Sequence, residues 1–308
     1  MTVAVGPRTW AHRHLLDVEG LSREELERII EIAVEMRTAR AARTHRTLLE
    51  EEIVGLAFFE ASTRTRISFE LAAKALGATV VDLDIAGSSV AKGESLVDTL
   101  RTLERTGVTT VALRHGEAGT PQLAVRATGM RVVNAGDGAH AHPTQALADA
   151  LTLRDAIGPL DGRLVAIVGD VLHSRVARSN IHALTTLGAR VRVAGPPAWI
   201  EGFDAWPGLE TATSLDAALD GADAVMALRV QLERGAEATN DYVERWRIDD
   251  ERMRLAGPNA VLLHPGPTNE GVEVTAQVAD GLRSLIGRQV ENGVPVRMAV
   301  LALLSGMA

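Results

Sequence analysis

The stretch FFEASTRTRISFE, residues 58–70 of the 308-residue chain, places three hydroxyls and two guanidinium groups between Ser62 and Arg66. Apolar residues precede and follow this polar segment. The pattern predicts a buried strand that ends at Phe59, a tight loop, and a helix that begins near Thr65. The first turn of such a helix has unpaired backbone N–H groups and the positive end of the helix dipole, which suit a phosphate. A capped helix start with exposed arginines has the same pattern, so the loop alone leaves both interpretations open.

Composition limits the class of protein. With 308 residues, 46% of them hydrophobic, the chain is long enough for two domains. A net charge of −8 argues against nucleic-acid binding by bulk electrostatics. The absence of cysteine excludes disulfides, thiolate metal sites and a cysteine nucleophile. The N-terminal segment lacks a signal-peptide pattern and no apolar run approaches the length of a membrane span, so we expect a cytoplasmic protein without membrane contact.

Strands and helices alternate along the chain in two series, after an amphipathic helix that opens with a capping box at residues 22–25. The pattern predicts strands at 53–59, 79–84, 108–113, 130–134, 164–169, 189–194, 223–228 and 260–263. Helices are expected at 65–76, 94–106, 121–128, 174–187 and 283–305. This alternation predicts an α/β fold of two lobes, each a parallel sheet covered by helices on both faces, joined by bridging helices.

The break between the two series falls near residue 150. We expect a first domain over 1–150, a second over 151–285, and a C-terminal helix over 286–308 that packs back on the first domain. Ligands of open parallel sheets bind beyond the carboxyl ends of the strands. Seven loops should therefore border one cleft: 60–66, 85–92, 114–119, 135–143, 170–175, 229–234 and 264–271.

The polar segment closely resembles the carbamoyl-phosphate motif, S-T-R-T-R, of the aspartate and ornithine carbamoyltransferases. Further blocks in family order extend the resemblance over about residues 14–305: SSVAKGES (88–95), LRHGE (113–117), NAGDGAHAHPTQALAD (134–149), GDVLHSRVARSN (169–180), LRVQLER (228–234) and HPGPTNEGVEV (264–274). The resemblance implies a transferase that passes the carbamoyl group of carbamoyl phosphate to an amino acid, without metal or organic cofactor.

The acceptor indicated by the sequence is L-aspartate, which places the reaction in pyrimidine biosynthesis. The His-Cys-Leu-Pro and S-M-G segments typical of ornithine enzymes are absent, and Leu228-Arg229-Val230-Gln231 resembles the aspartate enzymes. Two guanidinium forks, Arg175 and Arg229, also suit the two carboxylates of aspartate.

The resemblance implies a role for each matching residue. Ser62, Thr63, Arg64 and Thr65 would hold the phosphate, and Thr65, Arg114 and His142 would stabilise charge on the carbamoyl oxygen. Gln145 and the carbonyls around Pro265-Gly266 would orient the carbamoyl NH₂. Arg175, Arg229 and Gln231 would hold aspartate, with Ser89 and Lys92 supplied by a neighbouring subunit of a homotrimer. Glu60 resembles the acid that ties the lobes together when the site closes, through Arg175 or Arg234.

Alternatives stay open at this point. His142 is also consistent with a helix cap, and Arg114 and Arg175 with surface charges. Glu270 stands where relatives commonly carry arginine. Another amino acid acceptor, or a non-catalytic paralogue that binds carbamoyl phosphate, remains possible, and a dihydroorotase or regulatory-chain partner cannot be read from the sequence.

Overall fold

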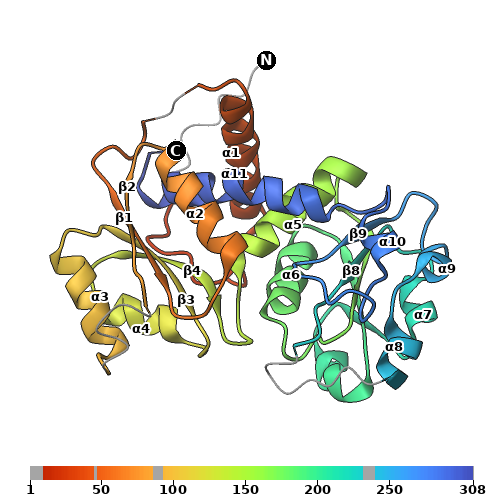
Figure 1. Ribbon diagram of the computed structural model, residues 1–308. Coiled ribbons are helices and arrows are strands. Elements are labelled where there is room, and N and C mark those ends of the chain that lie inside the picture. Colours follow the sequence, from red (N-terminus) through yellow and green to blue (C-terminus); the bar gives the residue numbers. More distant parts are fainter. Residues whose placement is uncertain (1–9, 45–46, 86–92, 232–239, 308) are drawn as a thin grey trace.

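The computed structural model of the chain describes residues 10–44, 47–85, 93–231 and 240–307. Its strands form two parallel sheets that lie side by side (Figure 1). The first sheet has the order β2 (Thr79–Asp82), β1 (Ile53–Phe58), β3 (Thr110–His115) and β4 (Arg131–Asp137). The second has the order β7 (Leu209–Ala212), β6 (Arg190–Ala194), β5 (Leu164–Val168), β8 (Ala224–Ala227) and β9 (Val261–Leu263). The predicted fold class, two parallel sheets covered by helices, is confirmed.

Helices connect and cover these strands. The first sheet is accompanied by α1 (Arg23–Ala41), α2 (Thr63–Ala75), α3 (Leu96–Arg105) and α4 (Thr120–Ala127). Helix α5 (Pro143–Ile157) leads to the second sheet, which is accompanied by α6 (Arg175–Thr186), α7 (Leu215–Leu219), α8 (Asn240–Trp246), α9 (Asp250–Met253), α10 (Ala276–Ala279) and the 3₁₀ turns η2 (Pro197–Trp199) and η3 (Phe203–Ala205). The last helix, α11 (Ile286–Leu304), packs against α1, α2 and α5.

Strands β1, β3 and β4 of the first sheet are buried on both faces, whereas the edge strand β2 has no buried residue. Neighbouring side chains of a strand point to opposite faces, and here both directions meet helices. Leu56 of β1 faces the core that contains α1 and α11, whereas Ala57 packs in a second cluster with Leu100 of α3 and Ala124 of α4. Double coverage explains why the strands read as continuous apolar runs.

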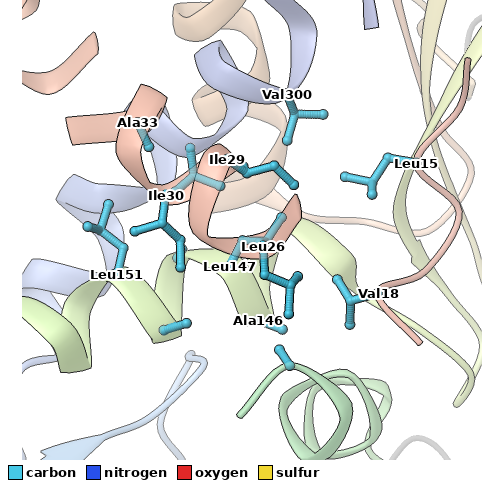
Figure 2. Packing of buried hydrophobic residues seen from close by; sticks show 14 of the residues in the cluster. Leu15, Val18, Leu26, Ile29, Ile30, Ala33, Ala146, Leu147, Leu151 and Val300 are labelled. Atoms are coloured by element: carbon cyan, nitrogen blue, oxygen red, sulfur yellow. The ribbon is translucent and has the colours of Figure 1, made fainter. Parts of the chain in front are cut away.

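One apolar core links the two sheets. Figure 2 shows Leu26 and Ile29 of α1 packed against Leu147 and Leu151 of α5 and Val300 of α11, and all five are buried. The same cluster continues to the strands of the second sheet. Each fully buried leucine or isoleucine contributes about 1.5–3 kcal/mol, so this cluster holds the sheets in one arrangement.

The capping box at the start of α1 is confirmed. Ser22 Oγ accepts a hydrogen bond from Glu25 N at 3.2 Å, and Glu25 Oε2 accepts one from Ser22 N at 2.8 Å. Predicted ends of the longer elements differ from the observed ones by a few residues.

The segment between β6 and β8 contains a strand that the sequence pattern did not predict. Strand β7 has four residues, only one of them buried, and lies at the edge of its sheet. It therefore lacks the apolar run that identifies the other strands. The short helices α7 to α10 were also not predicted, and the domain boundary expected near residue 150, which falls within α5, stays a prediction.

Within the described ranges, no helix combines the length and the apolar character that crossing a bilayer requires.

Candidate active site

A cavity of about 990 Å³ lies where strand ends from both sheets meet. Glu60 follows β1, Arg229 follows β8 and His264 follows β9, and all three line the cavity. The predicted site residues found in its wall are Ser62, Thr63, Arg64, Thr65, Arg114, His142, Gln145, Arg175, Arg229, Gln231, Pro265 and Gly266. Ser89, Lys92 and Arg234 lie outside the described residues. Twelve predicted residues from distant parts of the chain thus share one cavity.

The described wall of this cavity is strongly cationic. It contains five arginines and a single carboxylate, Glu60; the arginines are Arg64, Arg114, Arg175, Arg229 and Arg297. Like charges gathered around one space repel each other, and an anion that enters relieves this repulsion. The cavity is therefore suited to a ligand with several negative charges.

The loop before α2 presents hydrogen-bond donors to the cavity. Ser62 is the N-cap of α2, and its hydroxyl oxygen accepts a hydrogen bond from Thr65 N at 3.3 Å. The remaining N–H groups of the first turn have no partner within the helix and carry its positive dipole. Arg64 is exposed and forms no ion pair with a described carboxylate. Local sequence thus gathers backbone donors and a positive charge here, an arrangement that suits an anion.

Gly266 allows Arg64 to approach the opposite loop. Its φ is +65°, and a Cβ atom at this position would lie 2.7 Å from Arg64 Nη1. A side chain would therefore displace the guanidinium as well as strain the backbone.

Glu60 holds two of the predicted arginines together. Its carboxylate accepts hydrogen bonds from Arg114 Nη2 at 2.7 Å and from Arg175 Nη1 at 3.0 Å, with a further contact to Arg175 Nη2. The side chain of Arg114 is 12% exposed and that of Arg175 is 7% exposed. The expected pairing of Glu60 with Arg175 is present, and the pairing with Arg114 was not anticipated.

Gly136 gives both guanidiniums room. With φ at +119°, a Cβ atom there would lie 3.0 Å from Arg175 Nε and 3.1 Å from Arg114 Nη1. The glycine is part of the site because any larger residue would push against two buried cations.

His142 is buried and makes no side-chain cap for α5, although it occupies the N-cap position. Its backbone N–H donates to Ser179 Oγ at 2.8 Å. Burial lowers the pKa of His142 well below its ordinary value, and the charges of Arg114, Arg297 and Arg175 lower it further. The imidazole is therefore neutral at pH 7, and the simple capping role is not supported.

The remaining wall comes from loops of the second sheet. Gln231 Nε2 donates to the carbonyl of Arg229 at 3.3 Å, so the two residues form one unit. His264 donates from Nε2 to Glu273 at 3.0 Å and accepts at Nδ1 from Gly266 N at 2.9 Å. This second contact fixes the loop that carries Pro265 and Gly266.

Several residues of the cavity wall were not predicted from the sequence, notably Ser68, Gln289 and Arg297. Arg297 is 3% exposed, donates to Ser68 Oγ at 3.0 Å and lies over the ring of Phe69. One signal was available: Arg297 is a lone charge in the apolar run of the last helix. Gln289 has no comparable signal in the sequence.

Glu270, singled out from the sequence, lies outside the described wall of the cavity. Glu270 is exposed on the loop after β9. Among the described residues, no group of three or more histidine, aspartate or glutamate side chains is arranged to hold a metal ion.

Comparisons with known proteins agree over the whole length. Residues 13–155 match the profile "Aspartate/ornithine carbamoyltransferase, carbamoyl-P binding domain", and residues 161–304 match the corresponding "Asp/Orn binding domain". The chain is 50% identical to the aspartate carbamoyltransferase catalytic subunit of Myxococcus xanthus, over 94% of this chain and 98% of that protein. It is 49% identical to that of Methylorubrum extorquens, over 99% and 98%.

Solved structures give the same result. The aspartate transcarbamoylase of Trypanosoma cruzi, in complex with carbamoyl phosphate and aspartate, superposes with a TM-score of 0.85 at 30% identity. The match covers 94% of both chains. The chain therefore belongs to the aspartate/ornithine carbamoyltransferase family.

Proposed function

We propose that this chain is the catalytic subunit of an aspartate carbamoyltransferase, which transfers the carbamoyl group of carbamoyl phosphate to L-aspartate. The products are N-carbamoyl-L-aspartate and phosphate, a step of pyrimidine biosynthesis. One observation of the structure carries the proposal: a cavity with five arginines and one carboxylate in its described wall, into which the N-terminus of α2 opens. Carbamoyl phosphate and aspartate together carry several negative charges, which would offset the repulsion among these arginines.

The phosphate is assigned to the N-cap and first turn of α2. Ser62, Thr63, Arg64 and Thr65 supply hydroxyl, backbone and guanidinium donors from consecutive positions. A guanidinium can bind two phosphate oxygens at once, which fixes orientation as well as charge. The phosphate group first provides the contacts that bind the substrate, and it then departs as the leaving group.

The carbamoyl group is assigned to the side chains next to that first turn. Thr65, Arg114 and neutral His142 donate hydrogen bonds to its oxygen, on which negative charge develops during attack. A donor placed at such an oxygen contributes about 3 kcal/mol to lowering the barrier. Gln145 and the carbonyls of Pro265 and Gly266 accept from the carbamoyl NH₂.

Aspartate is assigned to the opposite wall. Arg229, supported by Gln231, binds one carboxylate, and Arg175 binds the other after its contacts with Glu60 are shared or exchanged. Two guanidinium groups of the second lobe thus meet around one dianionic acceptor. Lys92 and Ser89 complete this side in the proposal, supplied by a neighbouring subunit.

The reaction then needs positioning more than acid–base residues. The α-amine attacks the carbamoyl carbon, a C–N bond forms, and the C–O bond to phosphate breaks with its electron pair leaving on phosphate. The amine proton passes to the departing phosphate, which lies beside it. Orientation of two bound reactants supplies roughly 7–11 kcal/mol at best.

The first experiment identifies the product. The purified protein is incubated with carbamoyl phosphate and either L-aspartate or L-ornithine, and the products are separated by mass. Carbamoyl aspartate formation supports the proposal. Citrulline would show that the role assigned to Arg229 is wrong. Binding of carbamoyl phosphate without either product would point to another acceptor or to a non-catalytic paralogue.

A homotrimer with shared sites is the proposed assembly. Ile67 and Leu71 on one face of α2 are each 43% exposed, and Val81 of the neighbouring edge strand β2 is 37% exposed. An exposed apolar patch beside a sheet edge supports contact with another subunit.

Mixing inactive variants tests this assembly. Arg64→Ala and Lys92→Ala disable different residues, so mixed trimers regain some sites if Lys92 acts across the subunit boundary. Subunit exchange without recovery of activity would place each site within one chain. The proposal also includes a dihydroorotase or regulatory-chain partner, which co-purification tests. It further places the protein in the cytoplasm, which cell fractionation tests.

A further inference from the structure

A buried carboxylate, Asp149, lies behind the cavity and accepts three side-chain amides. Gln145 Nε2 and Gln289 Nε2 each donate to Asp149 Oδ1 at 2.8 Å, and Asn180 Nδ2 donates to Oδ2 at 2.9 Å. Asp149 is 0% exposed. The three donors come from three helices, α5, α11 and α6, which meet between the two sheets. None of the roles assigned above uses this aspartate.

The carboxylate determines which end of Gln145 faces the cavity. An ionised carboxylate has no proton to donate, so the NH₂ group of Gln145 must turn toward Asp149. The carbonyl oxygen, Oε1, is then left for the cavity that Gln145 lines. The pKa of Asp149 is raised above its ordinary value, because the effect of burial outweighs the three amide donors and the charge of Arg297, which lower it. Three N–H donors around two oxygens favour the ionised form.

The same carboxylate orients the loop on the other side of the cavity. Because Gln289 gives its NH₂ group to Asp149, its carbonyl oxygen accepts from the backbone N–H of His264 at 2.9 Å. His264 is the first residue of the loop that carries Pro265 and Gly266, and its Nδ1 accepts from Gly266 N. Asp149 therefore controls, through one amide on each side, two groups that line the cavity.

We propose that Asp149 is a positioning residue that makes the cavity select an acyl phosphate with an NH₂ group on its acyl carbon. By orienting Gln145 directly, and the loop of Pro265 and Gly266 through Gln289, it presents hydrogen-bond acceptors, and not donors, to that NH₂ group. The inference rests on the proposed function and adds the residue that determines specificity for the carbamoyl group. A methyl group in place of NH₂ leaves these acceptors unpaired, which a buried polar site disfavours.

Acetyl phosphate is the probe, because it replaces the NH₂ of carbamoyl phosphate by a methyl group. Dissociation constants for carbamoyl phosphate, acetyl phosphate and inorganic phosphate are measured by calorimetry on the purified protein, so no turnover is needed. The quantity of interest is the ratio of the acetyl phosphate constant to the carbamoyl phosphate constant. A high ratio in the wild type is expected.

Asp149→Leu keeps the branching of the side chain but removes every acceptor. We expect the ratio to fall by about tenfold, while the constant for inorganic phosphate changes by less than about twofold, because the phosphate loop is untouched. Gln289→Met breaks only one arm of the network and should lower the ratio by about threefold. It also provides the test if the leucine variant does not fold.

Thr152→Val is the matched control. Thr152 is a buried residue of the same helix, and its hydroxyl accepts from Asn292 of α11, so it too links α5 to α11. It does not contact Gln145 or Gln289, and the ratio should stay at the wild-type value. A merely structural role of Asp149 would make the control and the folded variants behave alike.

The outcomes separate the two claims. An unchanged ratio in the folded variants, or an equal fall in Thr152→Val, would overturn the role of Asp149 alone. A wild type that binds both acyl phosphates equally would also overturn this inference, whereas the proposed function fails only if carbamoyl phosphate and L-aspartate give no carbamoyl aspartate.

Discussion

Two regions of the cavity differ in the exposure and ion pairing of their arginines. In the first turn of α2, Arg64 is exposed and forms no ion pair with a described carboxylate. At the junction of the lobes, Arg114 and Arg175 are nearly buried and share the carboxylate of Glu60. The guanidinium group of the first region is accessible to solvent and to a ligand. The guanidinium groups of the second region are paired with a carboxylate of the protein.

The difference follows from burial. An exposed guanidinium is stabilised by water and needs no partner, whereas a buried one is costly unless it is paired. The start of α2 can therefore receive the proposed phosphate without rearrangement. Any ligand that takes Arg175 must share or replace Glu60, so binding there is coupled to the contact between the lobes.

The largest effect is expected in the exposed region. Arg64→Ala should weaken inorganic phosphate and carbamoyl phosphate alike by about 100-fold, because charge-assisted, bidentate hydrogen bonds are lost. Calorimetry measures both. Arg66→Ala is the control: Arg66 lies two residues on and pairs with Asp82, so both affinities should stay unchanged. Equal losses in the two variants would remove the special role of Arg64.

A smaller effect is expected in the opposite wall. Arg229→Ala should raise the aspartate concentration needed for half-maximal rate by about 30-fold, since one carboxylate loses its charged partner. Affinity for inorganic phosphate should stay within about twofold, because the phosphate loop belongs to the other lobe. Steady-state kinetics measures the aspartate concentration for half-maximal rate, and calorimetry measures the affinity for inorganic phosphate. A parallel loss of both would indicate a disturbed fold.

Glu60→Gln removes the carboxylate that pairs with Arg114 and Arg175. These two arginines then lack this anionic partner, as Arg64 lacks one among the described carboxylates. Two nearly buried guanidiniums then lack their shared charge, so the ligand-free protein should lose about 2 kcal/mol of stability. Inorganic phosphate should restore more stability to the variant than to the wild type, as thermal melts with and without phosphate would show. Identical phosphate-induced shifts would mean that Glu60 and ligand anions do not compete for these cations.

The smallest effect concerns pH. The pKa of His142 is lowered on folding, so below pH about 6.5 the unfolded chain gains a proton here that the folded protein does not bind. Stability contributed by the neutral form is complete above that pH and is lost as the pH falls toward the folded pKa. Relative to His142→Asn, the wild type should lose about 1 kcal/mol between pH 6.5 and 5.5 in denaturant titrations. Parallel pH profiles would contradict the burial of a neutral His142.

The prediction from sequence succeeded where neighbours in the chain define the structure. The start of α2 needs only Ser62, Thr65 and the apolar residues around them, because a helix cap is a contact over three residues. Strand β7 was missed because it has one buried residue in four, and its place at the sheet edge comes from pairing with β6. Its residues carry no periodic signal of their own.

The sequence by itself determined the α/β class, the positions along the chain of the strands that are buried on both faces, and the cluster of hydrogen-bond donors at residues 62–66. These features depend on the periodicity of apolar residues, on helix caps and on family motifs, all of which consist of residues close together in the chain. Only the tertiary structure decided that Glu60 binds Arg114 and Arg175, and that Asp149 holds Gln289 from 140 positions away. The physical reason is that such contacts form only when the helices and sheets have docked, and spacing along the chain carries no record of that docking.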